Sequence, residues 1–290
     1  MGVYAPSFLE PQNLRDILVN SSYTAVAATG MTMVIVAGGI DISIGSVLAV
    51  CSVLAANAAK AGLPNIAVLP IAVAAGCALG SLNGVLIAWA RIPSIIVTLG
   101  TMSVLRGAMT WATGGYWVRD LPPSFAAMGT GDFLRVPVPV WVAAITVVAG
   151  AVFMSRTRPG RYIYAVGGSA RAAELAGVKV PLVTFGVFAA SGGLVGLASM
   201  IYATRFSVVQ SNAGAGFELL VITAVVVGGT HILGGRGSVF GSVLGVLMLS
   251  VIGSALTYSH VSSYWEPAVQ GALVLLAVVV DSYRARRKLP

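Results

Sequence analysis

Charged residues are scarce in this 290-residue chain, in which Asp, Glu, Lys and Arg together make up only 9%. A water-soluble domain carries roughly a quarter of charged residues, which cover its surface. Here 57% of the residues are hydrophobic and the mean hydropathy is +0.92, so the apolar surface must face lipid. The scarcity of charge excludes a soluble globular fold and predicts an integral membrane protein.

Other absences narrow the function. No Gly-x-x-x-x-Gly-Lys-Ser/Thr phosphate-binding loop occurs, so we do not expect this chain to hydrolyse ATP. No cluster of His, Asp, Glu and Cys has metal-ligand or nucleophile spacing, which argues against a metal site and an intramembrane enzyme. Cys51 and Cys77 lie singly in apolar stretches and are expected to be packing residues. The net charge of +8 is spread over short connectors, which does not indicate nucleic acid binding.

Apolar runs near the length that crosses a bilayer recur along the whole chain. We predict an all-α, polytopic helical bundle that forms one transmembrane domain over residues 1–290, and its 35 glycines suit close helix packing in lipid. The sequence predicts about nine spans: Ile17–Ala37, Ile42–Ala59, Ile66–Ala88, Ile92–Ala112, Val138–Met154, Leu182–Ala203, Phe217–Leu233, Val239–Leu256 and Trp265–Val280.

The distribution of Lys and Arg predicts the orientation, because these residues are retained on the cytoplasmic side. In the nine-span arrangement, most of the basic residues fall on one side of the membrane: Arg91, Arg156, Arg158, Arg161, Arg171, Lys179, Arg236, Arg284, Arg286, Arg287 and Lys288. We therefore expect the connector 155–180 and the C-terminal tail to be cytoplasmic, and Met1 and the loop at Pro122 to be external. An external Met1 with no signal peptide before it leads us to expect a further span upstream.

The connector contains a predicted short helix. Ser169 is a favourable N-cap, Ala170–Ala176 are good helix formers, and Gly177 can end the helix. Its small residues would let it seat in a groove of a cytoplasmic partner. An ordinary surface loop is the alternative interpretation.

Four segments resemble one family in the right order along the chain. They are Gly38–Ser46, Ile92–Gly107, Gly160–Gly177 with its Ala172-Ala173 pair, and Gly228–Ser238. Together they resemble the permease subunits of ribose-type monosaccharide importers, a class of ABC transporters. The chain departs from that pattern at Ala170-Arg171, where relatives often carry an acidic residue. It also begins where the second span of relatives would begin, which agrees with the expected upstream span.

The resemblance implies a non-enzymatic transport subunit in the bacterial inner membrane. It would translocate a monosaccharide or similar small polyol delivered by an external binding protein. The chain itself would bind no cofactor, whereas a partner ATPase would use ATP and Mg. A weak internal similarity also suits a two-half design, because Gly38-Gly39 and Gly45–Leu48 resemble Gly228-Gly229 and Gly241–Leu244. We expect two inverted pseudo-repeats, a first half of about 1–155 and a second of about 181–290, joined by the connector 156–180, in a permease homodimer around a shared pathway. The implied ATPase-coupling residues are Gly167, Gly168, Ala172, Ala173, Glu174 and Gly177.

A sugar pathway requires amide, hydroxyl and aromatic groups more than charges. The candidates are Asn20, Asp41, Asn83, Thr98, Thr101, Arg106 and Trp111, with Gln210 and Asn212 in an external connector. Single polar residues in spans also tie helices together, and that alternative stays open for each. Asp41 is the only carboxylate that we place deep between spans. It would either cap a helix that begins at Ile42 or serve transport directly.

The second functional class is an ion-coupled secondary transporter of a small polar solute. Such transporters usually carry several membrane-embedded carboxylates or histidines. Asp41 and His231 alone give this class little support.

The predicted orientation can be tested by cysteine labelling. Ser169→Cys should react with a membrane-impermeant thiol reagent only after cells are permeabilised, because the connector is expected to face the cytoplasm. Labelling of this position in intact cells would contradict the topology.

Overall fold

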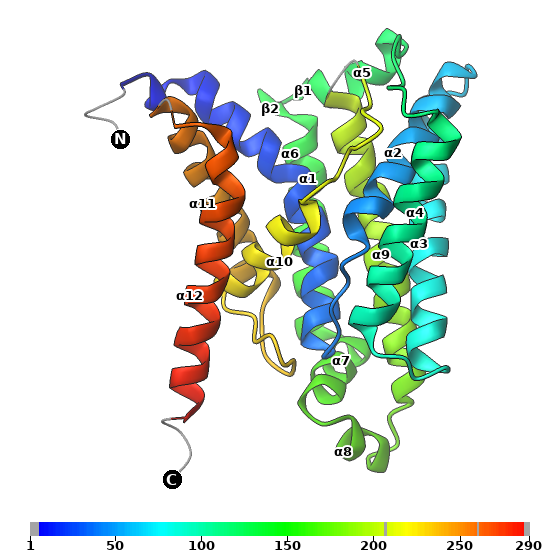
Figure 1. The fold of residues 1–290 in the computed structure, drawn as a ribbon, viewed down its shortest axis with the longest axis vertical. Helices are drawn as coiled ribbons and strands as arrows, with labels where there is room; N and C mark the ends of the chain where they lie inside the picture. Colours follow the sequence, from blue (N-terminus) through cyan, green and yellow to red (C-terminus); the bar gives the residue numbers. More distant parts are fainter. Residues whose placement is uncertain (1–5, 206–207, 260, 287–290) are drawn as a thin grey trace.

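The computed structural model describes residues 6–205, 208–259 and 261–286, and its ribbon is almost entirely helical (Figure 1). Its α-helices are α1 (Pro11–Val36), α2 (Ile44–Lys60), α3 (Asn65–Ala88), α4 (Ser94–Thr113), α5 (Pro123–Thr130), α6 (Val138–Arg156), α7 (Arg158–Gly168), α8 (Ala170–Leu175), α9 (Val180–Arg205), α10 (Phe217–Val227), α11 (Val239–Tyr258) and α12 (Glu266–Arg286). The short elements are the 3₁₀ turns η1 (Pro6–Leu9) and η2 (Ser263–Trp265) and the antiparallel strands β1 (Asp132–Phe133) and β2 (Val136–Pro137). Met1, Arg287 and Lys288 lie outside the described residues.

Each of the nine predicted apolar runs forms a helix. Within the described ranges, six helices are long and apolar enough to cross a membrane, namely α1, α3, α4, α6, α9 and α11. Three shorter apolar helices, α2, α10 and α12, make up the rest of the predicted set. The all-α membrane fold is thus confirmed, whereas nine full spans and the two pseudo-repeats stay predictions.

Two of the short helices begin inside the molecule. The chain leaves α1 at the end of the bundle where α7 and α8 lie, returns inward through residues 37–43, and then starts α2 (Figure 1). From the opposite end it returns inward through residues 208–216 and starts α10. The starts of the two helices touch, because the backbones of Gly45 and Gly214 pack directly against each other.

Two predicted boundaries were wrong at these helices. The second helix begins at Ile44 and not at Ile42, since Asp41 and Ile42 belong to the inward-running segment. The predicted Phe217–Leu233 helix ends at Val227, because Gly228 and Gly229 follow and Gly229 has a φ of +91°, which favours glycine. The remaining residues of that run form a loop that leads to α11.

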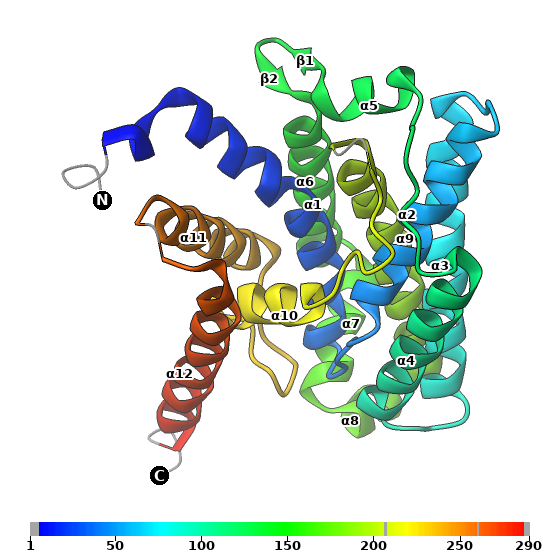
Figure 2. The same ribbon diagram turned by 45° about the horizontal axis from the view of Figure 1, so that its top comes forward.

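Helix α1 forms the centre of the bundle. It contacts α6, α9, α10 and α11 (Figure 2). The side chains from Ala25 to Val36 are buried, and most of them are completely inaccessible. A helix that is enclosed on all sides requires apolar residues around its whole circumference.

Helices α3 and α9 pack through glycine. A Cβ on Gly76 or Gly80 would overlap carbonyl groups of α9, and one on Gly192 or Gly196 would overlap carbonyl groups of α3. The two backbones are therefore in direct contact along one face. Small residues permit such close approach between helices in lipid, where van der Waals packing drives association.

This packing predicts that alanine destabilises the protein at one position and leaves its stability unchanged at the next. A Cβ at Gly192 would lie 2.9 Å from the Cα of Gly80, whereas a Cβ at Gly193 would have no heavy atom nearer than 3.7 Å. Gly192→Ala should therefore lower the stability by about 1–3 kcal/mol, the typical cost of overpacking. Gly193→Ala is the matched control and should unfold near the wild-type temperature in detergent. Equal unfolding temperatures for both variants would contradict the packing.

Candidate functional site

A buried chain of hydrogen bonds links three elements of the first half. The Asp41 carboxylate accepts hydrogen bonds from the Ser43 backbone N–H, at 2.9 Å, and from the Ser43 hydroxyl, at 2.6 Å. The Asn83 amide on α3 donates to the Ser43 hydroxyl oxygen at 2.9 Å, and the Thr101 hydroxyl on α4 donates to the Asn83 carbonyl at 2.6 Å. Asp41, Ser43 and Asn83 are almost completely buried. We call these four residues the buried network.

Further bonds tie α4 to the 37–43 segment. The Thr98 hydroxyl donates to the Ser94 carbonyl at 2.8 Å and approaches the Ile40 carbonyl at 3.3 Å. The Ile40 N–H in turn donates to the Ser94 hydroxyl. Backbone groups in a non-helical segment within a membrane protein need such partners.

These bonds favour a structural role for four predicted pathway residues. Asp41, Asn83, Thr98 and Thr101 come together, yet none of them lines the cavities described below. The capping role expected for Asp41 was wrong in detail, because α2 starts at Ile44 and the carboxylate binds Ser43 before the first helical turn. Asp41 instead fixes the turn that leads into the helix.

A groove of about 800 Å³ lies between α4 and the start of α10. It brings together three predicted residues, Arg106, Trp111 and Asn212. The Arg106 guanidinium donates to the Ala213 carbonyl at 3.2 Å, and the Trp111 side chain is 87% exposed. Asn20, by contrast, is exposed on α1 and lies outside this groove and outside the buried network.

Glu218 also lines this groove, which corrects the expectation that Asp41 is the only carboxylate deep between the spans. It lies in the first turn of α10, where the positive end of the helix dipole favours a carboxylate. Its Oε2 is buried against Gly45, at the start of α2. The sequence did carry a signal for this position, because Glu218 follows Gly214 and Gly216 and begins an apolar run.

A second cavity, of about 300 Å³, also borders residues 214–217. Tyr23, Tyr202 and Phe217 form an aromatic cluster at this cavity, with ring centroids 5.6 Å apart for the tyrosine pair and 5.7 Å apart for Tyr23 and Phe217. Glu266 and Gln270 of α12 complete it. The sequence analysis missed these residues, since nothing in their spacing shows that α1, α9, α10 and α12 meet here.

The connector forms two helices, α7 and α8, at one end of the bundle (Figure 1). The predicted cap is confirmed, because the Ser169 hydroxyl accepts a hydrogen bond from the Ala172 N–H at 3.2 Å. The preceding helix, α7, was not predicted. Its N-cap is Thr157, whose hydroxyl accepts a hydrogen bond from the Gly160 N–H.

The orientation of α8 corrects one expectation. Ala173, expected on the exposed face, is buried. The exposed face carries Ala172, Ala176 and Leu175, whose side chain is 76% exposed. Arg171 and Glu174 are exposed on the same short helix and form an ion pair at 3.2 Å.

Glycines join the connector to both halves. The Gly235 N–H donates to the Val36 carbonyl at 2.9 Å, and Gly167 packs so closely on Val36 that a Cβ would overlap its carbonyl. Gly234 lies against Gly38 in the same place. We call these residues the glycine junction. Three of the segments that carry the family resemblance thus meet at one point.

Comparison with known proteins gives a consistent result. A family model described as "Branched-chain amino acid transport system / permease component" matches residues 13–278. The ribose import permease protein of Haemophilus influenzae is 39% identical over 98% of this chain and 89% of its own length. The ribose import permease protein of Escherichia coli K12 is 38% identical over 96% of this chain and 88% of its own length.

A further relative is the autoinducer 2 import system permease protein of Salmonella typhi. It is 33% identical over 99% of this chain and 82% of its own length. No solved structure matches the chain significantly.

The buried network predicts how Asp41 variants behave. Asp41→Asn should unfold close to the wild-type temperature, because the amide oxygen can still accept both bonds from Ser43. Asp41→Leu leaves the buried Ser43 N–H without its acceptor and should cost about 1–3 kcal/mol. If Asp41 were a proton relay, Asp41→Asn would abolish transport and its pH dependence without changing the unfolding temperature.

Proposed function

This chain belongs to the branched-chain amino acid transport system permease family, and we propose that it imports a monosaccharide or similar small polyol as the membrane-spanning subunit of an ATP-driven importer. The observation that carries this proposal is the identity to ribose import permeases over nearly the whole chain. The exposed face of α8 and the two cavities, whose linings include Arg106, Glu218, Glu266 and Gln270, support it.

We infer that α8 docks on a partner ATPase, which would supply the ATP and Mg chemistry. Its exposed face presents Leu175 beside Ala172 and Ala176 and next to the Arg171–Glu174 ion pair, so an apolar anchor is flanked by small and charged residues. Such an anchor can fill a pocket while the small residues allow close approach. Through α7, the docked helix would reach the glycine junction and with it the end of α1 and the α10–α11 loop.

In this proposal the substrate passes near the starts of α2 and α10. Their first N–H groups have no intrahelical acceptor and could donate to sugar hydroxyl oxygens. Arg106, Asn212 and Glu218 offer donors and acceptors in the groove between α4 and α10. In the second cavity, Tyr23 and Tyr202 offer aromatic surfaces beside Glu266 and Gln270. Mixed polar and aromatic linings suit a polyol, which has polar edges and apolar faces.

The same proposal assigns an orientation and an assembly. The connector and the end of α12 lie at one end of the bundle, and η1 lies at the other (Figure 1). The basic residues of the connector support a position of this end in the bacterial cytoplasm. The end with α5 and the β1–β2 hairpin would then receive the external binding protein. A second permease copy facing α4 would close the open groove at Arg106 and Trp111 into a shared pathway.

The docking proposal is tested on the exposed face of α8. Ala172→Arg should weaken co-purification of the ATPase by about tenfold or more, because a large charged side chain cannot be accommodated in a close-packed interface. Sugar uptake should fall in parallel, while insertion and folding remain normal, since the residue is exposed.

The matched control is Ala127→Arg, an exposed alanine of α5 at the opposite end of the molecule. It should keep ATPase association at the wild-type level. If Ala172→Arg also kept both association and uptake, α8 would not be the docking helix.

A further inference from the structure

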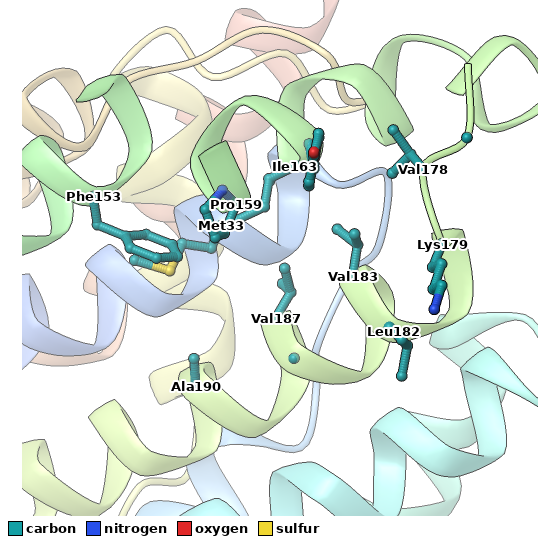
Figure 3. A pocket seen from close by; sticks show the side chains of 13 residues that line it. Met33, Phe153, Pro159, Ile163, Val178, Lys179, Leu182, Val183, Val187 and Ala190 are labelled. Carbon is teal, nitrogen blue, oxygen red and sulfur yellow. The ribbon is translucent and has the colours of Figure 1, made fainter. Parts of the chain in front are cut away.

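A groove on the outside of the bundle opens next to the connector (Figure 3). Its volume is about 470 Å³, within the range of roughly 300–1,000 Å³ typical of small-ligand sites. The apolar part of its wall comes from four helices, α1, α6, α7 and α9. The side chains that form it include Met33, Phe153, Ile163, Val183, Val187 and Ala190.

The polar side chains of this groove lie at its connector end. Among the lining residues, only Lys179 and Tyr162 carry polar side-chain atoms, and both belong to the connector. Arg158 and Arg161, next to the lining residues Pro159 and Tyr162, are exposed on α7. The groove is therefore apolar along α9 and carries one cationic lining residue, Lys179, at its connector end.

The cations at the connector end have no anionic partner in the part of the chain that the structure describes. Lys179, Arg158 and Arg161 form no ion pair there. The one carboxylate in the connector sequence, Glu174, pairs with Arg171 at 3.2 Å. An occupant that carries a negative charge and an apolar portion would therefore match both parts of the groove.

We propose that this groove binds an anionic phospholipid, with an acyl chain along α9 and the phosphate at Lys179. Basic pockets between membrane helices bind anionic head groups, and charged N–H···O bonds to phosphate are strong. The groove continues from the connector onto two helices long enough to span the membrane, α6 and α9, so it crosses the level at which head groups and chains meet. A second copy of this chain fits less well, because its own connector offers no unpaired carboxylate to Lys179.

Native mass spectrometry of the full-length protein in detergent tests the proposal, with phosphatidylglycerol and phosphatidylcholine titrated separately. The wild type should retain phosphatidylglycerol more strongly. Lys179→Gln should reduce that retention by about fivefold, the effect of one basic residue near a lipid surface. Retention of phosphatidylcholine should not change in this variant, since its head group has no net charge.

A second variant fills the groove. A Cβ on Gly186 would meet open space, so Gly186→Phe should place its ring in the groove without a clash and reduce the binding of both lipids. The matched controls are Gly100→Phe, which also meets open space but lies on α4, and Arg91→Gln, which removes a cation outside the groove. Both controls should retain phosphatidylglycerol like the wild type.

Three results would overturn the proposal. The first is equal retention of the two lipids by the wild type. The second is unchanged retention in Gly186→Phe. The third is a change in oligomeric mass alone in Gly186→Phe, which would show that the groove is an interface between protein copies.

Discussion

Direct contact between glycine backbones holds the two halves of this chain together. Gly192 on α9 packs on Gly76 of α3, Gly214 packs on Gly45, and the glycine junction joins Val36 to Gly235. In lipid the helices gain little from burying apolar surface against each other, so association depends on close van der Waals packing. A Cβ at these contacts would separate the backbones. The abundance of glycine in the chain is therefore a condition of the fold.

These contacts also allow two helices to begin in the interior. Non-helical backbone is tolerated inside a membrane protein only where other protein groups or a polar cavity satisfy it. The 37–43 segment obtains its partners from Ser94, Asp41 and the buried network. The 208–216 segment adjoins the two cavities and accepts a bond from Arg106. The arrangement places a carboxylate, Glu218, in a groove beside the start of α10.

The glycine junction connects the proposed docking helix to the interior of the bundle through only a few contacts. Helix α8 follows α7 directly, and α7 ends in Gly167 and Gly168, which pack on Val36 and Gly235. The Tyr164 hydroxyl of α7 also donates to the Gly237 carbonyl at 2.9 Å. A displacement of α8 by an ATPase would therefore act on the end of α1 and on the α10–α11 loop together, since close-packed backbone transmits strain.

The sequence by itself determined the membrane class, the positions of nine apolar helices, the cap at Ser169 and the family. These follow from hydropathy and from hydrogen bonds within a few residues, and the family follows from motifs read along the chain. Only the tertiary structure decided that Ala173 faces inward, that Glu218 lines a groove, and that Tyr23 and Tyr202 share a cavity with Glu266. Those positions depend on contacts between helices far apart in the sequence. Because the helices of this chain are apolar around most of their circumference, hydrophobic periodicity does not show which face of a helix will be buried.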